Sequence, residues 1–275
     1  MNAMTATGTA RRAARSDTLK YAARTGFTAR GVIHLLVGVL ALRIALGDGG
    51  TTADQGGALA EIAGQPFGKV LLWAMGVGLA ALALWQLSEA AFGAAGPDGH
   101  KPRKRLAAGA QGVFYGFVSY SVLAFAIGSR GSGGGSSDQQ SQDVTAKALG
   151  LPAGQWLVCA AALVVVGAGL WIGFQAARRK YREEMRTGEM SRRVRRAVDV
   201  TGIGGGVARG LVFAAAGGFA VAAAVTYDPE KAKGMDDTIR AFRETPAGPW
   251  LLVVLAVGLM LFGVFSFAMA RWRKL

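Results

Sequence analysis

The hydrophobic residues of this chain gather in six long runs that are separated by polar segments. The runs cover approximately residues 31–47, 68–92, 109–128, 153–177, 202–227 and 248–270. A helix needs roughly 20 apolar residues to cross a hydrocarbon layer of about 30 Å, and the first run reaches this length if its helix begins a few residues earlier. Barrel strands would instead be short and would alternate apolar and polar positions. The pattern therefore predicts an all-α, polytopic membrane protein with six transmembrane helices.

A short motif recurs three times along the chain, as Pro66-Phe67-Gly68, Pro152-Ala153-Gly154 and Pro246-Ala247-Gly248. Each copy follows one apolar run and opens the next, so the six predicted helices form three tandem two-helix hairpins. Proline is tolerated in the first turn of a helix, because the N–H that it lacks would be unpaired there. We therefore expect the three prolines to mark where the chain re-enters the membrane. The predicted domains are a basic tail, 1–21, and three repeats, 22–95, 96–181 and 182–275.

Aligning the copies on the proline gives equivalent positions in the first helix of each repeat, namely Arg30-Gly31, Tyr115-Gly116 and Arg209-Gly210. In the second and third copies another glycine stands four residues earlier, which gives the spacing that lets two membrane helices approach closely. The predicted helix-packing glycines are Gly31, Gly112, Gly116, Gly206 and Gly210. Each repeat has two spans, so the copies share one orientation, and we expect parallel repeats in a pseudo-threefold bundle.

The basic residues are distributed unequally between the two sides of the predicted bundle. Of 31 Lys and Arg residues, 22 lie in the N-terminal tail, the loops after the second and fourth runs and the C-terminus, against 7 in the other three loops. Positive charge in short loops favours the cytoplasm, so we expect a plasma-membrane protein with both termini cytoplasmic. The net charge of +14 would suit nucleic acid, but its one-sided distribution favours anionic lipid at the cytoplasmic face. We expect lipid and an unidentified membrane protein as partners, and no nucleic acid.

The polar loops on the other side have their own predicted structure. The Gly- and Ser-rich segment 129–142 is typical of a flexible linker without fixed structure. Segments 59–63, 144–149 and 236–242 precede the three prolines and favour short helices at the membrane interface.

Few residues of the predicted spans could carry chemistry. Cys159 is the lone cysteine and His34 and His100 are the two histidines, so we expect no metal site, no cofactor, no catalytic residue and no enzyme activity. Arg30 and His34 lie one turn apart on one helix face, and Glu89 comes at a similar depth on the second run. We predict that Arg30, His34 and Glu89 form a small polar cluster, with Arg209 as the repeat-equivalent arginine. The alternatives are interfacial anchoring and a packed, structural histidine.

Two segments of the first repeat, ARTGFTARGVIHLLVGVLAL and PFGKVLLWAMGVGLAALALWQL, carry a family resemblance. The chain resembles, over about residues 22–273, the DUF1206 family of bacterial, mainly actinobacterial, membrane proteins. The resemblance implies three two-helix repeats and no established activity. The chain departs from the family pattern at Tyr115, which replaces the arginine in copy two, and at Gln86, where the family often has a basic residue.

These observations favour a non-enzymatic membrane component with a structural, regulatory or partner-binding role. The alternative is a carrier or pore for a small or lipid-like molecule along the pseudo-threefold axis. Near the middle of the predicted spans the polar residues are Ser119, Tyr120 and Ser121. Ion-coupled carriers usually need a carboxylate or histidine at that depth, so the sequence argues against ion coupling and leaves a lipid-like substrate open.

Overall fold

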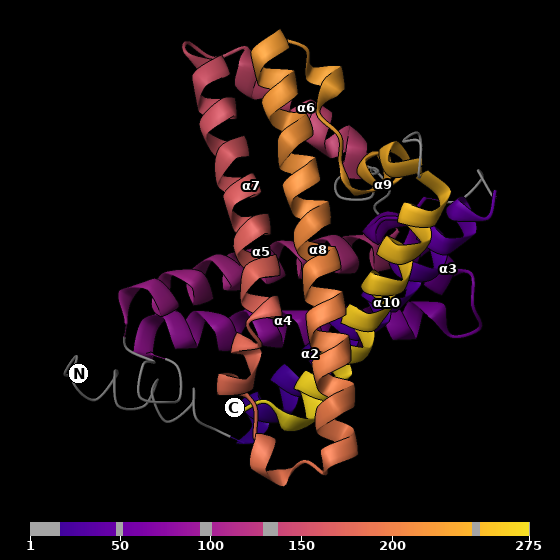
Figure 1. The fold of residues 1–275 in the computed structure, drawn as a ribbon, viewed down its shortest axis with the longest axis vertical. Helices are drawn as coiled ribbons and strands as arrows, with labels where there is room; N and C mark the ends of the chain where they lie inside the picture. The colour runs from indigo at the N-terminus through magenta and orange to yellow at the C-terminus, as the bar shows by residue number, and fades with distance from the viewer. Residues whose placement is uncertain (1–16, 48–51, 94–100, 129–136, 244–247, 275) are drawn as a thin grey trace. The chain divides into compact units, whose positions relative to one another are not determined.

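The computed structural model describes residues 17–47, 52–93, 101–128, 137–243 and 248–274 (Figure 1). Within these ranges the chain forms α-helices and short 3-10 helices and contains no strand. Six of the helices are long and apolar enough to cross a membrane. They are α2 (Asp17–Ala45), α4 (Gly68–Phe92), α5 (Pro102–Ile127), α7 (Gly154–Ala177), α8 (Arg192–Thr226) and α10 (Gly248–Trp272). The predicted fold class, an all-α membrane protein with six spans, is confirmed.

The helix bounds follow the apolar runs at some ends and extend beyond them at others. The run 68–92 matches α4 at both ends, whereas α8 begins at Arg192, ten residues before its apolar run. Arginine is a good helix former, so a helix can continue past the apolar part into a basic segment. Proline occurs in the first turn of α5, where it costs no intrahelical hydrogen bond.

Three short helices precede the spans α4, α7 and α10, as the sequence predicts. They are α3 (Gln55–Ala63), α6 (Ser137–Leu149) and α9 (Met235–Arg243). The prediction of an unstructured linker is wrong for residues 137–142, which form the first turns of α6; residues 129–136 lie outside the described part. The run that begins at Ser137 contains neither glycine nor proline before Leu149, so it can form a helix. The remaining elements are the 3-10 helices η1 (Lys180–Glu184), η2 (Thr187–Glu189) and η3 (Pro229–Lys231).

In its first two copies, the Pro-x-Gly motif forms a tight turn before the helix rather than the first helical turn. The N-cap residues Phe67 and Ala153 have φ of 63° and 59°, and the helices begin at the glycines that follow. Pro66 and Pro152 therefore precede the helices, which corrects their expected place in the first turn. Pro246 lies outside the described residues.

The glycine of the motif is required by the tightness of this turn. The Gly68 N–H donates to the carbonyl of Gln65 at 2.9 Å, which closes the turn. A Cβ on Gly68 would overlap the carbonyl oxygen of Ile62, and this backbone atom cannot rotate away as a side chain could. The glycine at this position is thus explained by the space that a backbone contact requires.

The chain divides into two compact units that do not coincide with the three predicted repeats. The first unit takes in residues 1–30, 62–133 and 266–275, and the second takes in 31–61 and 134–265. In the first unit α4 packs along α5, and in the second α7 packs along α8 (Figure 1). Both pairs join the second helix of one predicted repeat to the first helix of the next.

The predicted packing glycines differ in their surroundings. A Cβ built on Gly210 would lie 2.6 Å from the Gly169 carbonyl oxygen, and one on Gly206 would overlap the Ala176 side chain, so α7 and α8 touch there. In the first unit, a Cβ on Gly112 would lie 3.1 Å from the Leu87 nitrogen.

The two other predicted packing glycines, Gly31 and Gly116, differ from each other. The Gly31 carbonyl lies 2.8 Å from a Cβ built on Gly263, which brings α2 and α10 together in the second unit. The close packing expected at Gly116 is not found: among the described residues, no atom lies within 4 Å of a Cβ built there. The four-residue spacing places Gly112 and Gly116 on one helix face, but a Cβ would press against α4 at Gly112 and meet open space at Gly116.

Candidate functional site

A buried arginine joins three helices in the first unit. The Arg30 side chain, in a residue that is 6% exposed, donates from Nε to the Ser266 hydroxyl at 3.0 Å and from Nη1 to the Tyr115 hydroxyl at 2.9 Å. These residues come from α2, α10 and α5, and each belongs to a different predicted repeat. A guanidinium is a rigid fork of five donors, so it can hold two acceptors in a fixed geometry. One side chain thus fixes the relative position of three helices.

A second buried arginine lies next to this contact, at the C-terminal end of the chain. The Arg273 guanidinium stands 4.6 Å from the Trp85 ring centroid and 5.1 Å from that of Phe27, which itself contacts Trp85 edge-on. Arg273 also pairs with Glu89 at 3.8 Å, and both side chains are largely buried. Stacking on aromatic faces and an ion pair together stabilise a cation away from water. This arrangement holds the chain end against α2 and α4.

Two hydrogen bonds connect α4 and α5 at different depths. The Gln86 side-chain amide donates to the Gln111 side-chain oxygen at 2.6 Å, and the Ser119 hydroxyl donates to the Gly76 carbonyl at 2.8 Å. Ser119 is one of the few polar residues near the middle of the predicted spans. Polar contacts between membrane helices of this kind contribute about 0.6–2 kcal/mol each. The mid-span serine therefore has a structural partner.

The structure gives each member of the predicted polar cluster a separate set of contacts. Arg30 and Glu89 belong to the first unit and make the contacts with Tyr115, Ser266 and Arg273 described above. His34 belongs to the second unit, where its ring meets Phe262 edge-on at a centroid distance of 4.8 Å. The joint cluster of Arg30, His34 and Glu89 stays a prediction.

The repeat-equivalent Arg209 is surrounded by aromatic rings. Its guanidinium lies 4.9 Å from the Phe262 centroid and 5.3 Å from that of Phe213. Phe262 thus contacts His34 and Arg209 in the second unit. The Arg209 guanidinium lies at a distance typical of a cation–π contact with this ring, whereas His34 meets the ring edge-on.

Some residues of the buried clusters were not identified from the sequence. Tyr115 occupies the position equivalent to Arg30, so the repeat alignment contains a signal for it. Ser266 and Arg273 have no such signal, because their partners are set by tertiary packing. In the described part of the chain, no three His, Cys, Asp or Glu side chains come together in a group that could hold a metal ion.

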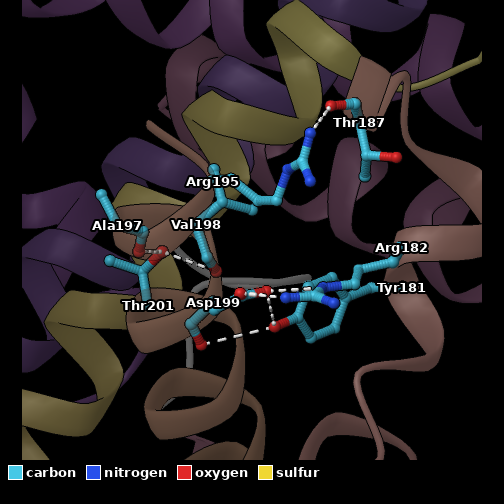
Figure 2. A network of polar contacts seen from close by, with 8 residues as sticks. All are labelled: Tyr181, Arg182, Thr187, Arg195, Ala197, Val198, Asp199 and Thr201. Atoms are coloured by element: carbon cyan, nitrogen blue, oxygen red, sulfur yellow. Dashed lines mark hydrogen bonds and ion pairs between the residues drawn. The ribbon is translucent and has the colours of Figure 1, made fainter. Parts of the chain in front are cut away.

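Three polar side chains, Tyr181, Arg182 and Asp199, form a hydrogen-bonded latch across the connection between α7 and α8 in the second unit. Asp199 of α8 accepts two hydrogen bonds from Arg182, one of them from Nε at 2.8 Å, and a third from the Tyr181 hydroxyl at 3.2 Å (Figure 2). Burial, followed by the charge of Asp199, raises the pKa of Tyr181 to about 12. The hydrogen bond to Asp199 raises the pKa of Arg182. The latch keeps η1 against the first turns of α8.

A basic pocket lies beside this latch, with a volume of about 380 Å³. The pocket is lined by Arg179, Arg192, Arg195, Arg196, Asp199, Val200 and Ile203. The Arg195 side chain donates to the Thr187 carbonyl at 2.9 Å, which holds it toward η2 (Figure 2). Ser191 caps the amino end of α8, where its hydroxyl accepts from Val194 N at 3.3 Å. The sequence predicts this segment as basic, but the pocket itself depends on how η1, η2 and α8 fold together.

Comparison with known proteins identifies the family of the chain. The model of DUF1206, a domain of unknown function, matches three times, at residues 25–93, 106–179 and 204–273. The uncharacterized protein YxxB of Bacillus subtilis (strain 168) is 30% identical over 258 residues, which cover 90% of this chain and 89% of YxxB. No solved structure matches the chain. Three matches in tandem and similarity over nearly the whole length show that this six-span membrane protein belongs to the DUF1206 family.

Proposed function

We propose that the protein is a non-enzymatic component of the bacterial plasma membrane with a structural, regulatory or partner-binding role and with both termini in the cytoplasm. The observation that carries the proposal is the contact of Arg30 with Tyr115 and Ser266. A buried arginine in a membrane protein is a functional candidate by default. Here it binds hydroxyl groups from two other helices of its own bundle, which is the role of a structural cross-link.

The energetics support this interpretation. Hydrogen bonds that involve a charged group contribute about 1.5–3 kcal/mol each, and a buried guanidinium that lost its acceptors would be strongly unfavourable. The Arg30 contacts therefore favour one arrangement of α2, α5 and α10. A rigid bundle of this kind suits a protein that presents a fixed surface to others.

Helix α7 offers a face on which a partner could pack. Leu163, Val164 and Leu170 are between 57% and 71% exposed, whereas Val158 on the same helix is 7% exposed. In a membrane, exposed apolar side chains meet lipid or another transmembrane helix. The two environments can be distinguished by crosslinking from this face.

The partner-binding role is tested by photo-crosslinking in the native host. A photoreactive residue is placed at Leu163 or Leu170, and at Val158 as the buried control. The proposal expects a discrete protein adduct from the exposed positions and none from the control. Protein-dependent movement of a solute or lipid across proteoliposomes would contradict it and favour the carrier.

The orientation is tested separately by cysteine labelling of intact cells. In a Cys159→Ser background, Asp143→Cys of α6 and Arg193→Cys of α8 place single thiols on opposite predicted sides. A membrane-impermeant maleimide should label the first variant in intact cells and the second only after lysis. The reverse pattern would refute cytoplasmic termini.

A further inference from the structure

Arginine side chains concentrate positive charge in the basic pocket beside the α7–α8 connection. The carboxylates of the described residues do not neutralise this charge. Four of its seven lining residues are arginines, and Asp199 is the carboxylate among them. Asp199 already accepts hydrogen bonds from Arg182 through both of its oxygens. Within the described ranges, Arg179, Arg192 and Arg196 form no ion pair. Like charges that line one pocket repel one another, and a bound anion would relieve the repulsion.

The donors of the pocket match the chemistry of a phosphate group. Guanidinium groups bind phosphate oxygens through pairs of parallel N–H···O hydrogen bonds, which makes arginine the preferred side chain for this ligand. The amino end of α8 adds the positive end of the dipole of a 35-residue helix. Arg195 is held in place by its contact with Thr187, so part of the site is formed before a ligand arrives.

One wall of the pocket is apolar. Val200 and Ile203 follow the arginines along α8, at the point where the helix turns from basic to hydrophobic. A phosphate that carries a hydrocarbon chain could place its charge among the arginines and its chain against this wall. The predicted orientation puts the pocket at the cytoplasmic leaflet, which is rich in anionic lipid.

We propose that this basic pocket, lined by Arg179, Arg192, Arg195 and Arg196, is a binding site for a phosphate group. The group can come from an anionic phospholipid headgroup or from a soluble phosphate compound, since both present the same oxygens. The proposal goes beyond the partner-binding role and does not depend on it, because that role is tested on the exposed face of α7.

The test compares two double variants of the full-length protein with equal loss of charge. Arg195→Gln with Arg196→Gln removes half of the pocket arginines, and glutamine keeps the helix propensity. Arg178→Gln with Arg193→Gln is the matched control, because both residues are exposed and neither lines the pocket. Each protein is placed in nanodiscs of phosphatidylcholine with a minor share of phosphatidic acid, and bound lipid is measured by native mass spectrometry.

The wild type should retain phosphatidic acid, and the pocket variant should bind it about ten- to a hundredfold more weakly, as expected for one or two lost charge-assisted contacts. The control should stay close to the wild type. An equal loss in both variants would overturn the proposal, because the lipid would then respond to overall charge. Binding of inorganic phosphate to the detergent-solubilised wild type, with the same dependence on the pocket arginines, would identify a soluble source.

A second measurement does not depend on the folding of any variant. Phenylglyoxal modifies accessible arginines, and the modified positions in the wild type can be read by peptide mass spectrometry. Phosphatidic acid or inorganic phosphate should slow modification of the pocket arginines and leave Arg178 and Arg193 unchanged. Equal rates at pocket and control positions with both probes would overturn the proposal.

Discussion

Replacement of Gly210 by alanine is expected to force α7 and α8 apart. The new Cβ would lie 2.6 Å from the Gly169 carbonyl oxygen and 2.7 Å from the Gly173 nitrogen, well below the 3.4 Å at which ordinary contact begins. Both atoms belong to the backbone of α7, so no side chain can rotate to make room. The shortfall of about 0.8 Å must be met by a shift of one helix against the other.

The same geometry sets the free-energy cost of this shift. A gap of about 0.5–1 Å removes a quarter to a half of the dispersion energy of each affected atom pair, and overpacked cores lose about 1–3 kcal/mol. Alanine regains up to about 1 kcal/mol over glycine through its helix propensity. Gly218→Ala provides the matched control, because it lies on the same helix and a Cβ there meets no described atom within 4 Å. Gly210→Ala should therefore be less stable than Gly218→Ala by about 1–3 kcal/mol.

The assay is unfolding of each variant in mixed micelles by titration with sodium dodecyl sulfate, followed by circular dichroism. The control reports the intrinsic effect of alanine, so the difference between the two variants isolates the helix contact. Equal midpoints for Gly210→Ala and Gly218→Ala would refute the close approach of α7 and α8 at this position. If both midpoints fell equally below that of the wild type, both glycines would be needed for a reason other than this helix contact.

Three further outcomes are expected. Tyr115→Phe should lower the free energy of unfolding by about 1–3 kcal/mol, because Arg30 loses a buried acceptor. The control Tyr120→Phe, at an exposed site of α5, should leave the free energy of unfolding unchanged, and equal melting curves for the two variants would contradict the cross-link. The phenol of Tyr181 should ionise near pH 12, and the difference in ultraviolet titration between the wild type and Tyr181→Phe measures this ionisation. Because the pKa is raised in the folded state, its contribution to the free energy of unfolding is fully present below pH 10 and is lost as the pH rises through 12. Asp236→Ala should expose the α3–α9 region to faster hydrogen exchange, because its carboxylate accepts from the Ala53 N–H and from Arg240; unchanged exchange at Ala53 would count against this contact.

Local composition predicted the helices because the membrane acts on each segment separately. A run of about 20 apolar residues has one stable form in hydrocarbon, a helix, whatever lies elsewhere in the chain. The Pro-x-Gly motif likewise predicted the start of α4, but the sequence assigned the helical turn to Pro66, while the backbone contact at Gly68 requires the glycine. A missing N–H can be recognised in sequence, whereas space for a backbone atom cannot.

The sequence by itself determined the six spans, the three copies and the basic character of the α7–α8 connection, since these depend on residue type and order. Only the tertiary structure decided which residues meet. Arg30 lies 85 residues from Tyr115 and 236 from Ser266, and no spacing rule connects positions so far apart. The same four-residue glycine spacing leads to tight contact at Gly210 and to open space at Gly116, because a motif permits a close approach and the partner helix determines whether it occurs.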